Sequence, residues 1–276
     1  MNVTTPNVDT IIQGDCLEEM KKLPDGCIDL TVTSPPYDNL RKYNGYVFDF
    51  EGIAQQLFRI TKSGGVVVWV VGDATIDGSE TGTSFRQALY FKEIGFKLHD
   101  TMIYQKAGGG ANGDMRGYIQ SFEFMFILSK DRPKSTNCIE DRRNVVPPRI
   151  KIERQGRRKP NGDKKGFRLI ERKEFGKRTN VWTYNVGNNS TTTDRIAFDH
   201  PAIFPEQLAA DHILSWSNPD DLILDPMCGS GTTCKMAKYH QRHFLGYDIS
   251  EEYCEIARKR VAAVPARLDR WAEAEG

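Results

Sequence analysis

The sequence has no long hydrophobic run and no Cys-x-x-Cys pair, and each of these absences excludes a class of protein, whereas the lack of a strong net charge argues neither for nor against a polyanionic partner. No stretch approaches the roughly eighteen consecutive apolar residues of a membrane-spanning helix, so we expect no membrane partner. The amino terminus also lacks the basic and then apolar pattern of a signal peptide. Six cysteines without a zinc-ligand spacing predict reduced thiols, no metal site and a cytoplasmic location.

The chain contains 276 residues, and its 39% hydrophobic content is sufficient for a real core. Strand and helix patterns alternate along most of it, which predicts a parallel α/β architecture. A turn is expected at residues 63–65, and two of the strands, 97–105 and 122–128, are expected to pair as a hairpin. The expected strands are 28–33, 66–71, 97–105, 122–128, 222–225 and 243–248, and the expected helices are about 51–61, 84–94, 205–216, 234–240 and 250–264.

The string Thr33-Ser34-Pro35-Pro36-Tyr37 follows an apolar strand pattern and would project from the carboxyl edge of that strand. Open α/β sheets bind their ligands at this edge. Two successive prolines remove two backbone donors and fix two φ angles, so carbonyl oxygens stay unpaired beside a hydroxyl and an aromatic ring. Such a pocket suits a planar ligand that bears an amino group. Taken alone, the same string is more often an ordinary Pro-rich loop.

A second motif, residues 222–233, has the pattern of a buried strand that ends in a glycine-containing turn and opens a helix. Gly229 and Gly231 would let the backbone approach a ligand closely. The next strand ends in Asp248, which could accept both hydroxyls of a ribose. Asp225 adds a carboxylate, which is unfavourable beside a pyrophosphate but favourable beside a cation. S-adenosylmethionine, which is positively charged, satisfies this preference better than NAD does. An NAD oxidoreductase is the remote alternative, because its fingerprint needs a third small residue where this chain has Cys234.

Together and in this order, residues 33–37 and 225–233 resemble the catalytic and cofactor motifs of the beta-group amino-methylating DNA methyltransferases. The likeness extends from about residue 9 to about residue 264. It implies a Rossmann-like, mostly parallel, seven-stranded methyltransferase sheet with helices on both faces and an inserted basic target-recognition segment. It also implies S-adenosyl-L-methionine as the cofactor and double-stranded DNA as the partner.

The resemblance assigns roles to individual residues. Residues 13–16 resemble the amino-terminal cofactor element, and residues 200–205 resemble the segment that closes over the cofactor. Met227 stands where the family usually has Phe, and its unbranched thioether can fill the same apolar gap. The expected catalytic residues are Ser34, Pro35, Pro36 and Tyr37, and the expected cofactor-binding residues are Asp15, Cys16, Phe204, Asp225, Pro226, Gly229, Gly231, Thr232 and Asp248.

Net charge is only +1, but its distribution is uneven. Residues 130–178 contain eighteen Lys or Arg against seven Asp or Glu, a net charge of +11, so the rest of the chain sums to −10. Such a run is usually a solvated face, yet between two halves of a catalytic domain it suits phosphate neutralisation. We therefore expect a catalytic half at 1–130, a recognition insertion at 131–184 and a cofactor half at 185–276. The expected DNA-binding residues are Arg116, Arg157, Arg158, Lys159, Lys164 and Lys165.

The predicted activity is methylation of the exocyclic amino group of a base flipped out of DNA. Ser before Pro-Pro-Tyr favours cytosine N4, because in the resembling family this residue is common among cytosine enzymes, and adenine N6 is the alternative. No Pro-Cys occurs, unlike in the cytosine-C5 enzymes. An RNA modifier or a catalytically silent nucleic-acid-binding protein is the alternative of another class. The sequence leaves a homodimer open.

Overall fold

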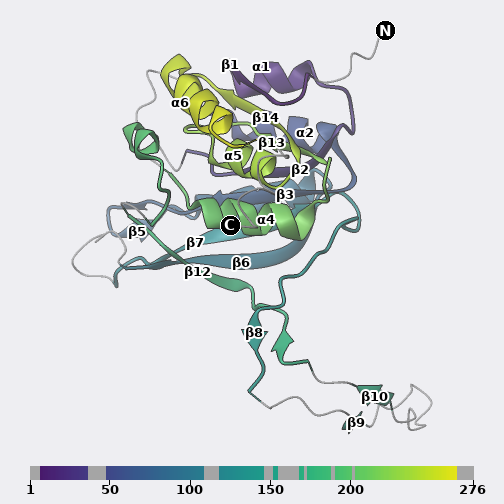
Figure 1. Ribbon diagram of the computed structural model, residues 1–276. Coiled ribbons are helices and arrows are strands. Elements are labelled where there is room, and N and C mark those ends of the chain that lie inside the picture. The colour runs from purple at the N-terminus through teal and green to yellow at the C-terminus, as the bar shows by residue number, and fades with distance from the viewer. Residues whose placement is uncertain are drawn as a thin grey trace. The chain divides into compact units, whose positions relative to one another are not determined.

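The computed structural model describes residues 7–36, 48–108, 118–145, 152–154, 168–170, 173–187, 190–200 and 203–265. An eight-stranded sheet with the order β1-β14-β13-β2-β3-β7-β6-β12 organises the fold (Figure 1). β7 runs antiparallel to both of its neighbours, and the other adjacent pairs are parallel. The strands are β1 (Thr10–Gln13), β2 (Ile28–Thr33), β3 (Thr61–Val71), β6 (Lys97–Ala107), β7 (Phe122–Ser129), β12 (Val181–Asn185), β13 (Leu222–Asp225) and β14 (His243–Asp248).

This sheet confirms the mostly parallel α/β architecture predicted from the sequence. β2 and β14 have the predicted bounds, and β6 pairs with β7 as the expected antiparallel neighbour. The sheet has eight strands where seven were expected, and two of them, β1 and β12, were not among the strands placed from the sequence pattern; β12 pairs with β6. Trp182 and Tyr184 of β12 are buried and alternate with exposed residues, so one face of this short run is held by the core.

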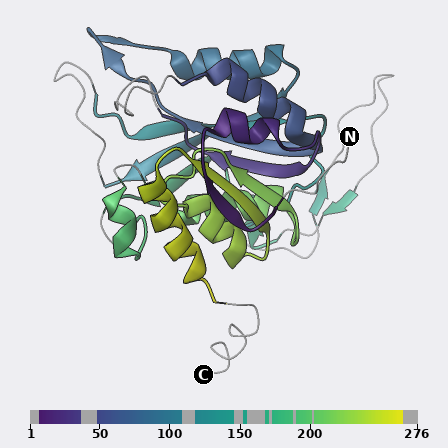
Figure 2. The same cartoon turned by 90° about the horizontal axis from the view of Figure 1, so that it is seen from above.

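Helices cover both faces of the sheet (Figure 2). One face carries α1 (Cys16–Lys21), α2 (Phe50–Ile60) and α3 (Thr83–Glu93), and the other carries α4 (Glu206–Trp216), α5 (Thr232–Tyr239), α6 (Glu251–Ala262) and the 3-10 helix η1 (Arg195–Asp199). Side-chain caps set three of the starts: Asp15 caps α1, Asp49 accepts from the Gly52 N–H at 2.9 Å before α2, and Ser250 accepts from the Tyr253 N–H before α6. No helix in the described part of the chain is both long and apolar enough to cross a membrane.

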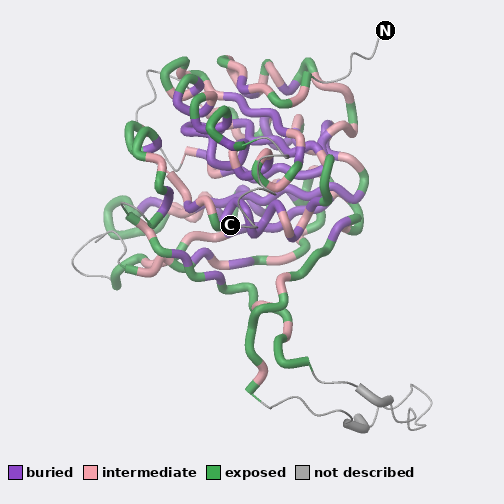
Figure 3. Tube along the Cα trace, viewed as in Figure 1, coloured by how far each residue is buried: buried purple, intermediate pink, exposed green. Residues whose placement is uncertain are grey.

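The middle strands of the sheet are buried on both sides (Figure 3). Trp69 of β3 is fully buried, and its ring contacts Phe50 at 5.9 Å and Phe91 at 5.1 Å between centroids. The Trp69 indole N–H donates to Gln87 Oε1 at 2.8 Å, so its polar edge is satisfied inside the core. These contacts join α2 and α3 to β3 and make the sheet a rigid support for the loops at its edge.

A bulge in β3 replaces the turn predicted at residues 63–65. The register with β2 shifts between Ile28 and Leu30, because extra residues of β3 loop out at that point. Gly64 has a φ of +80°, a conformation that glycine adopts without strain, and its N–H donates to the Lys130 carbonyl at 2.6 Å. The glycines that indicated a turn therefore bend the strand without ending it.

The chain divides into two compact units, and the second comprises residues 138–179. It contains two short antiparallel pairs: β8 (Arg142–Arg143) with β11 (Phe175–Gly176), and β9 (Ile152–Arg154) with β10 (Arg168–Ile170). Residues 131–137 and 180–184, which the sequence placed in the insertion, belong to the first unit together with the sheet.

Candidate active site

The carboxyl ends of three adjacent parallel strands form the candidate active site. β2, β13 and β14 lie side by side, and the predicted motif residues follow directly after them. Ser34, Pro35 and Pro36 leave β2, the turn 226–231 leaves β13, and Asp248 ends β14. Pro35 is buried, whereas Ser34 and Pro36 are half-buried. Ligands bind at this edge of open α/β sheets, and the fold thus brings the two predicted motifs to one place.

Two hydrogen bonds join the two motifs, and the residues that form the first of them are 192 positions apart in the sequence. Thr33 Oγ1 donates to Asp225 Oδ1 at 2.8 Å, and Thr233 Oγ1 donates to the Val32 carbonyl at 3.0 Å. All four residues are buried, so water does not compete for these bonds. These bonds hold the start of the loop that follows β2 (residues 34–36, the Ser34 loop) at a fixed distance from the start of the turn that follows β13 (residues 226–231, the glycine turn).

Asp225 is a buried carboxylate with only neutral donors among its named partners. It is 1% exposed, and its Oδ1 accepts a second hydrogen bond from the Met227 N–H at 3.2 Å. Burial raises the pKa of Asp225 from 3.8 to about 6, although the hydrogen bonds from Thr33 and Met227 act in the opposite direction, and the charge of Asp248 raises the pKa further. This end of β13 therefore favours a positively charged ligand.

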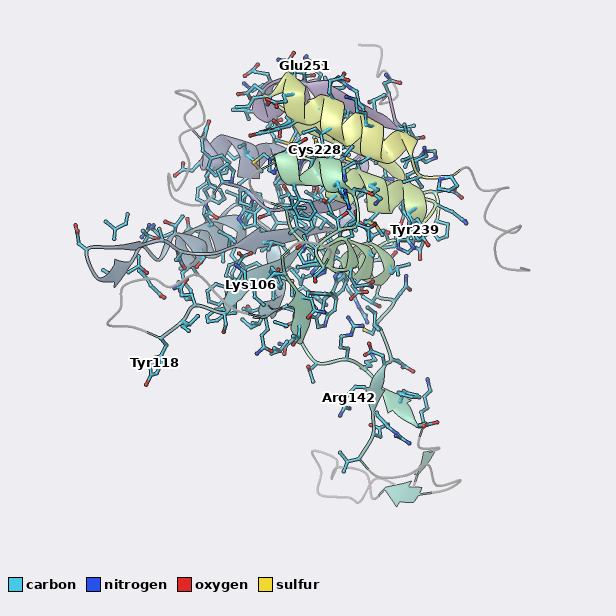
Figure 4. The ribbon with its side chains drawn as sticks, turned by 60° about the vertical axis from the view of Figure 1, so that its left-hand side comes forward. Lys106, Tyr118, Arg142, Cys228, Tyr239 and Glu251 are labelled. Carbon is cyan, nitrogen blue, oxygen red and sulfur yellow. The ribbon has the colours of Figure 1, made fainter. Side chains whose placement is uncertain are left out.

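The turn after β13 depends on two glycines. Gly229 and Gly231 have φ angles of +48° and +77°, in the left-handed region that side chains disfavour. A Cβ at Gly229 would lie 2.7 Å from His200 Nε2, and one at Gly231 would lie 2.6 Å from the Ala257 Cβ. These glycines were expected to let a ligand approach the backbone closely. In the structure, the atoms that a Cβ would meet belong to the protein itself, to His200 and Ala257. Figure 4 labels Cys228 within this turn, just ahead of α5.

Asp248 holds the same turn from the neighbouring strand. Its Oδ2 accepts from the Gly229 N–H at 2.9 Å, and its Oδ1 accepts from the Ser250 N–H at 2.9 Å. Burial raises the pKa of Asp248, and these two hydrogen bonds lower it in part. Pro226 and Thr232, also predicted to bind the cofactor, are buried at the two ends of the turn. Asp248 thus fixes the turn and keeps lone pairs for further donors.

The amino-terminal element predicted to bind the cofactor lies beside β14. The Gly14 N–H donates to the Asp248 carbonyl at 2.8 Å, which brings Asp15 to the same group of strand ends. Asp15 caps α1 by accepting two backbone N–H groups. Burial raises the pKa of the Cys16 thiol to about 12, so this cysteine stays protonated at neutral pH. Phe204 is half-buried two residues before α4.

No individual role was predicted from the sequence for three residues that shape the site, namely Thr33, Thr233 and Arg260. The two threonines carry the bonds between the motifs, and a threonine in a strand or a helix gives no signal of such a role. Arg260 is 1% exposed and donates to the Ser230 carbonyl at 2.6 Å. It falls in the basic last turn of a helix pattern, which is typical of a solvated face.

Several predicted residues lie outside the described part of the chain. They are Tyr37, Arg116, Arg157, Arg158, Lys159, Lys164 and Lys165. Among the residues that the structure does describe, no group of three or more His, Cys, Asp or Glu side chains has a geometry suited to a metal ion.

Two sequence relatives of this chain are methyltransferases. The orphan methyltransferase M.BamHII of Bacillus amyloliquefaciens is 56% identical over 242 residues, which cover 87% of this chain and 91% of the relative. The type II methyltransferase M.BglII of Bacillus subtilis is 26% identical over 276 residues, covering 94% of this chain and 70% of the relative.

Solved structures of the same fold also match. The PvuII DNA methyltransferase, described as cytosine-N4-specific, has a TM-score of 0.65 at 20% identity and covers 95% of this chain and 89% of its own. The M1.HpyAVI–SAM complex has a TM-score of 0.59 at 20% identity and covers 91% and 98%. A family model described as DNA methylase, for N6 and N4 methyltransferases, matches residues 28–259. With a site built from both motifs of that family, the chain belongs to the DNA methylases, which use S-adenosylmethionine to methylate amino groups of DNA bases.

Proposed function

We propose that this DNA methyltransferase transfers a methyl group from S-adenosylmethionine to the N4 amino group of a cytosine flipped out of double-stranded DNA. The observation that carries the proposal is the 2.8 Å hydrogen bond between Thr33 Oγ1 and Asp225 Oδ1. It holds the motif for the base and the motif for the cofactor at neighbouring strand ends. Direct transfer needs this proximity, because reacting atoms must come within about 3–3.5 Å of each other.

The acidic edge of the sheet fits S-adenosylmethionine. Burial raises the pKa of both Asp225 and Asp248, so each carboxylate gains from a nearby cation. Asp248 uses its two oxygens for the Gly229 and Ser250 N–H groups and retains lone pairs for ribose hydroxyls. The solved M1.HpyAVI complex, whose fold is similar, is described as holding this cofactor. When bound, the cofactor would supply an electrophilic methyl group on a sulfonium sulfur; its S–CH3 bond would break as the N–CH3 bond forms, S-adenosylhomocysteine would leave as a neutral thioether, and the methylated nitrogen would release one proton to solvent.

The Ser34 loop activates and orients the base. An exocyclic amino nitrogen is a poor nucleophile because its lone pair is delocalised into the ring. Ser34 Oγ and the Pro35 carbonyl accept the two amino N–H groups and draw the nitrogen toward tetrahedral geometry, while Tyr37 stacks on the ring. Pro35 and Pro36 restrict the loop, so these acceptors are oriented before the base arrives. Flipping is required because the amino group inside a duplex cannot meet a methyl donor in line.

Two observations favour cytosine over adenine. Ser34 precedes Pro-Pro-Tyr, which is common among N4-cytosine enzymes of the resembling family. The PvuII enzyme, whose description names cytosine N4, has the same fold. Adenine N6 is the alternative, because both bases present the same kind of amino group to the Ser34 loop.

The insertion supplies the contacts with DNA phosphates. In its described part, acidic side chains already have basic partners: Glu140 accepts from Lys173 at 2.7 Å, and Asp141 is paired with Arg178. The remaining basic residues supply the excess charge, which includes the predicted contacts Arg157, Arg158, Lys159, Lys164 and Lys165. Arg116, in the glycine-rich stretch before β7, is proposed to contact the flipped base or the DNA, and an unchanged DNA affinity and turnover in Arg116→Ala would remove it from the site.

A methyl-transfer competition tests the substrate class. Tritiated S-adenosylmethionine is mixed with the protein and equal masses of duplex DNA and structured RNA, with Ser34→Ala as the control. Label that enters DNA and is lost in the variant supports the proposal. Label in RNA moves the protein to the RNA modifiers, and binding of nucleic acid without any label indicates a silent binder. A homodimer and a cytoplasmic location stay predictions.

A further inference from the structure

Arg260 is the most completely buried cation in the described part of the chain. It lies in the last turn of α6, and its side chain has no exposed surface. A buried guanidinium is tolerated only when carboxylates and carbonyls satisfy its five N–H donors. The partners of Arg260 therefore show which segments this residue holds together.

The first set of partners belongs to the glycine turn at the cofactor site. Nη1 of Arg260 donates to the Ser230 carbonyl at 2.6 Å, to Ser230 Oγ at 3.0 Å and to Thr232 Oγ1 at 3.2 Å. Ser230 stands between Gly229 and Gly231, whose positive φ angles give the turn its shape. The guanidinium thus holds the middle of the turn from the side of α6.

The second set comprises Asp194, which directly precedes η1, and Glu206, the first residue of α4. Arg260 Nε donates to Asp194 Oδ2 at 3.0 Å, and Nη2 donates to Glu206 Oε1 at 2.6 Å. Lys235 of α5 contacts the same two carboxylates, each at 2.8 Å. The two cations and two anions balance in charge. Glu206 follows Phe204 by two residues, so the network reaches the segment that was expected to close over the cofactor.

We propose that Arg260 is a positioning residue of the cofactor site, which locks the glycine turn, Asp194 and the start of α4 into one arrangement. Lys235 also neutralises Asp194 and Glu206, so the particular contribution of Arg260 is its bond to the Ser230 carbonyl. Without Arg260, the turn loses its link to Asp194 and to the start of α4, and ordering the turn becomes part of the free energy of cofactor binding. This inference rests on the proposed use of S-adenosylmethionine.

Arg242 provides a matched control. This arginine is 8% exposed and donates to the Ser217 carbonyl at 2.8 Å and to the His240 carbonyl at 2.6 Å. It lies before β14 begins, at the opposite end of that strand from Asp248. Arg242→Met removes a comparable buried guanidinium and leaves the cofactor site untouched.

The test compares Arg260→Met, Arg260→Lys and Arg242→Met with the unchanged protein. Binding of S-adenosylmethionine is measured by titration calorimetry, and amide hydrogen exchange at residues 228–233 is measured without cofactor. We expect Arg260→Met to weaken binding about tenfold or more and to speed exchange in the turn, with kcat at saturating cofactor nearly unchanged. In Arg260→Lys, cofactor affinity and amide exchange should lie between those of Arg260→Met and of the unchanged protein. Arg242→Met should lose thermal stability without changing cofactor affinity or amide exchange in the turn.

Each outcome decides one point. Unchanged binding and exchange in Arg260→Met, or equal losses in Arg242→Met, overturn the positioning role. If Arg260→Met does not fold, Arg260→Lys decides, because it retains the charge beside Asp194 and Glu206, and unchanged exchange in its turn contradicts the proposal. Failure of the unchanged protein to bind S-adenosylmethionine would overturn the proposed function itself.

Discussion

The carboxylates of the sheet edge and those of the insertion differ in their surroundings. At the edge, burial raises the pKa of Asp225 to about 6 and raises that of Asp248 as well. In the insertion, hydrogen bonds from Lys173 and Arg178 lower the pKa values of the exposed Glu140 and Asp141. The sheet edge therefore carries negative charge that lacks a cationic partner in these contacts, whereas the described acids of the insertion are already paired with bases.

This difference matches two ligands of opposite charge. A cationic cofactor gains at the edge, because it relieves the desolvation of buried carboxylates. A polyanion gains at the insertion, where basic residues outnumber the acids that pair with them. One chain with a net charge of +1 can thus bind both a cation and a polyanion.

The largest expected effect is a loss of kcat on removal of the Ser34 hydroxyl, which is proposed to contact the base and neither the cofactor nor a phosphate. Ser34→Ala should lower kcat about 100-fold, because the base loses an acceptor that acts mainly in the transition state. The Kd for S-adenosylmethionine should change less than about twofold, since the cofactor contacts stay intact. Steady-state kinetics and calorimetry measure the two quantities. Ser79→Ala, which removes an exposed hydroxyl from the short strand β5 (Ser79–Glu80), is the control, and equal losses in kcat and Kd would contradict the role of Ser34.

A smaller effect is expected from the insertion. Neutralising Arg157, Arg158 and Lys159 to Gln should weaken DNA binding about tenfold and reduce the slope of log K against log salt by about 2 to 3. Lys173→Gln is the matched control, because its ammonium already bonds to Glu140 and should leave the slope nearly unchanged. Fluorescence anisotropy over a salt series measures both. A triple variant with the slope of the unchanged protein would remove these residues from the interface.

The smallest effect concerns the buried charge of Asp225. Asp225→Asn keeps an acceptor for Thr33 but removes the charge, so affinity for S-adenosylmethionine should fall about fivefold at pH 7.5. Because the folded pKa is raised, stability from Asp225 is present below pH 3.8 and lost as pH rises through about 6. Asp225→Asn should therefore raise the free energy of unfolding of the cofactor-free protein at pH 7.5.

Measurements across pH check the sign of that prediction. In the unchanged protein, cofactor affinity should fall as pH drops through about 6, because Asp225 becomes protonated. In Asp225→Asn this part of the pH dependence should vanish, and the gain in stability should shrink toward pH 4. A variant that is less stable than the unchanged protein at pH 7.5 would show that the carboxylate stabilises the strand end.

The fold and the strand ends that carry the two motifs were predicted from the sequence, because both depend on local patterns. The apolar run of β2 and the turn residues Gly229 and Gly231 are visible along the chain, and their strands are neighbours in the sheet. The contacts between segments were not predictable. Thr33 reaches Asp225 and Arg260 reaches Ser230 only after folding, and neither residue type gives a signal of a long-range partner. β12 is short and polar on one side, so its pairing with β6 depends on the core it covers.

The most direct test of the account is to identify the methylated base. The protein is incubated with mixed-sequence duplex DNA and methyl-labelled S-adenosylmethionine, and the DNA is digested to nucleosides for mass spectrometry. The account predicts label in N4-methylcytosine, and its loss in Ser34→Ala. Label in N6-methyladenine would keep the site and its mechanism but contradict the choice of base. No label in either nucleoside would contradict the central claim that these two strand ends form an amino-methylating site.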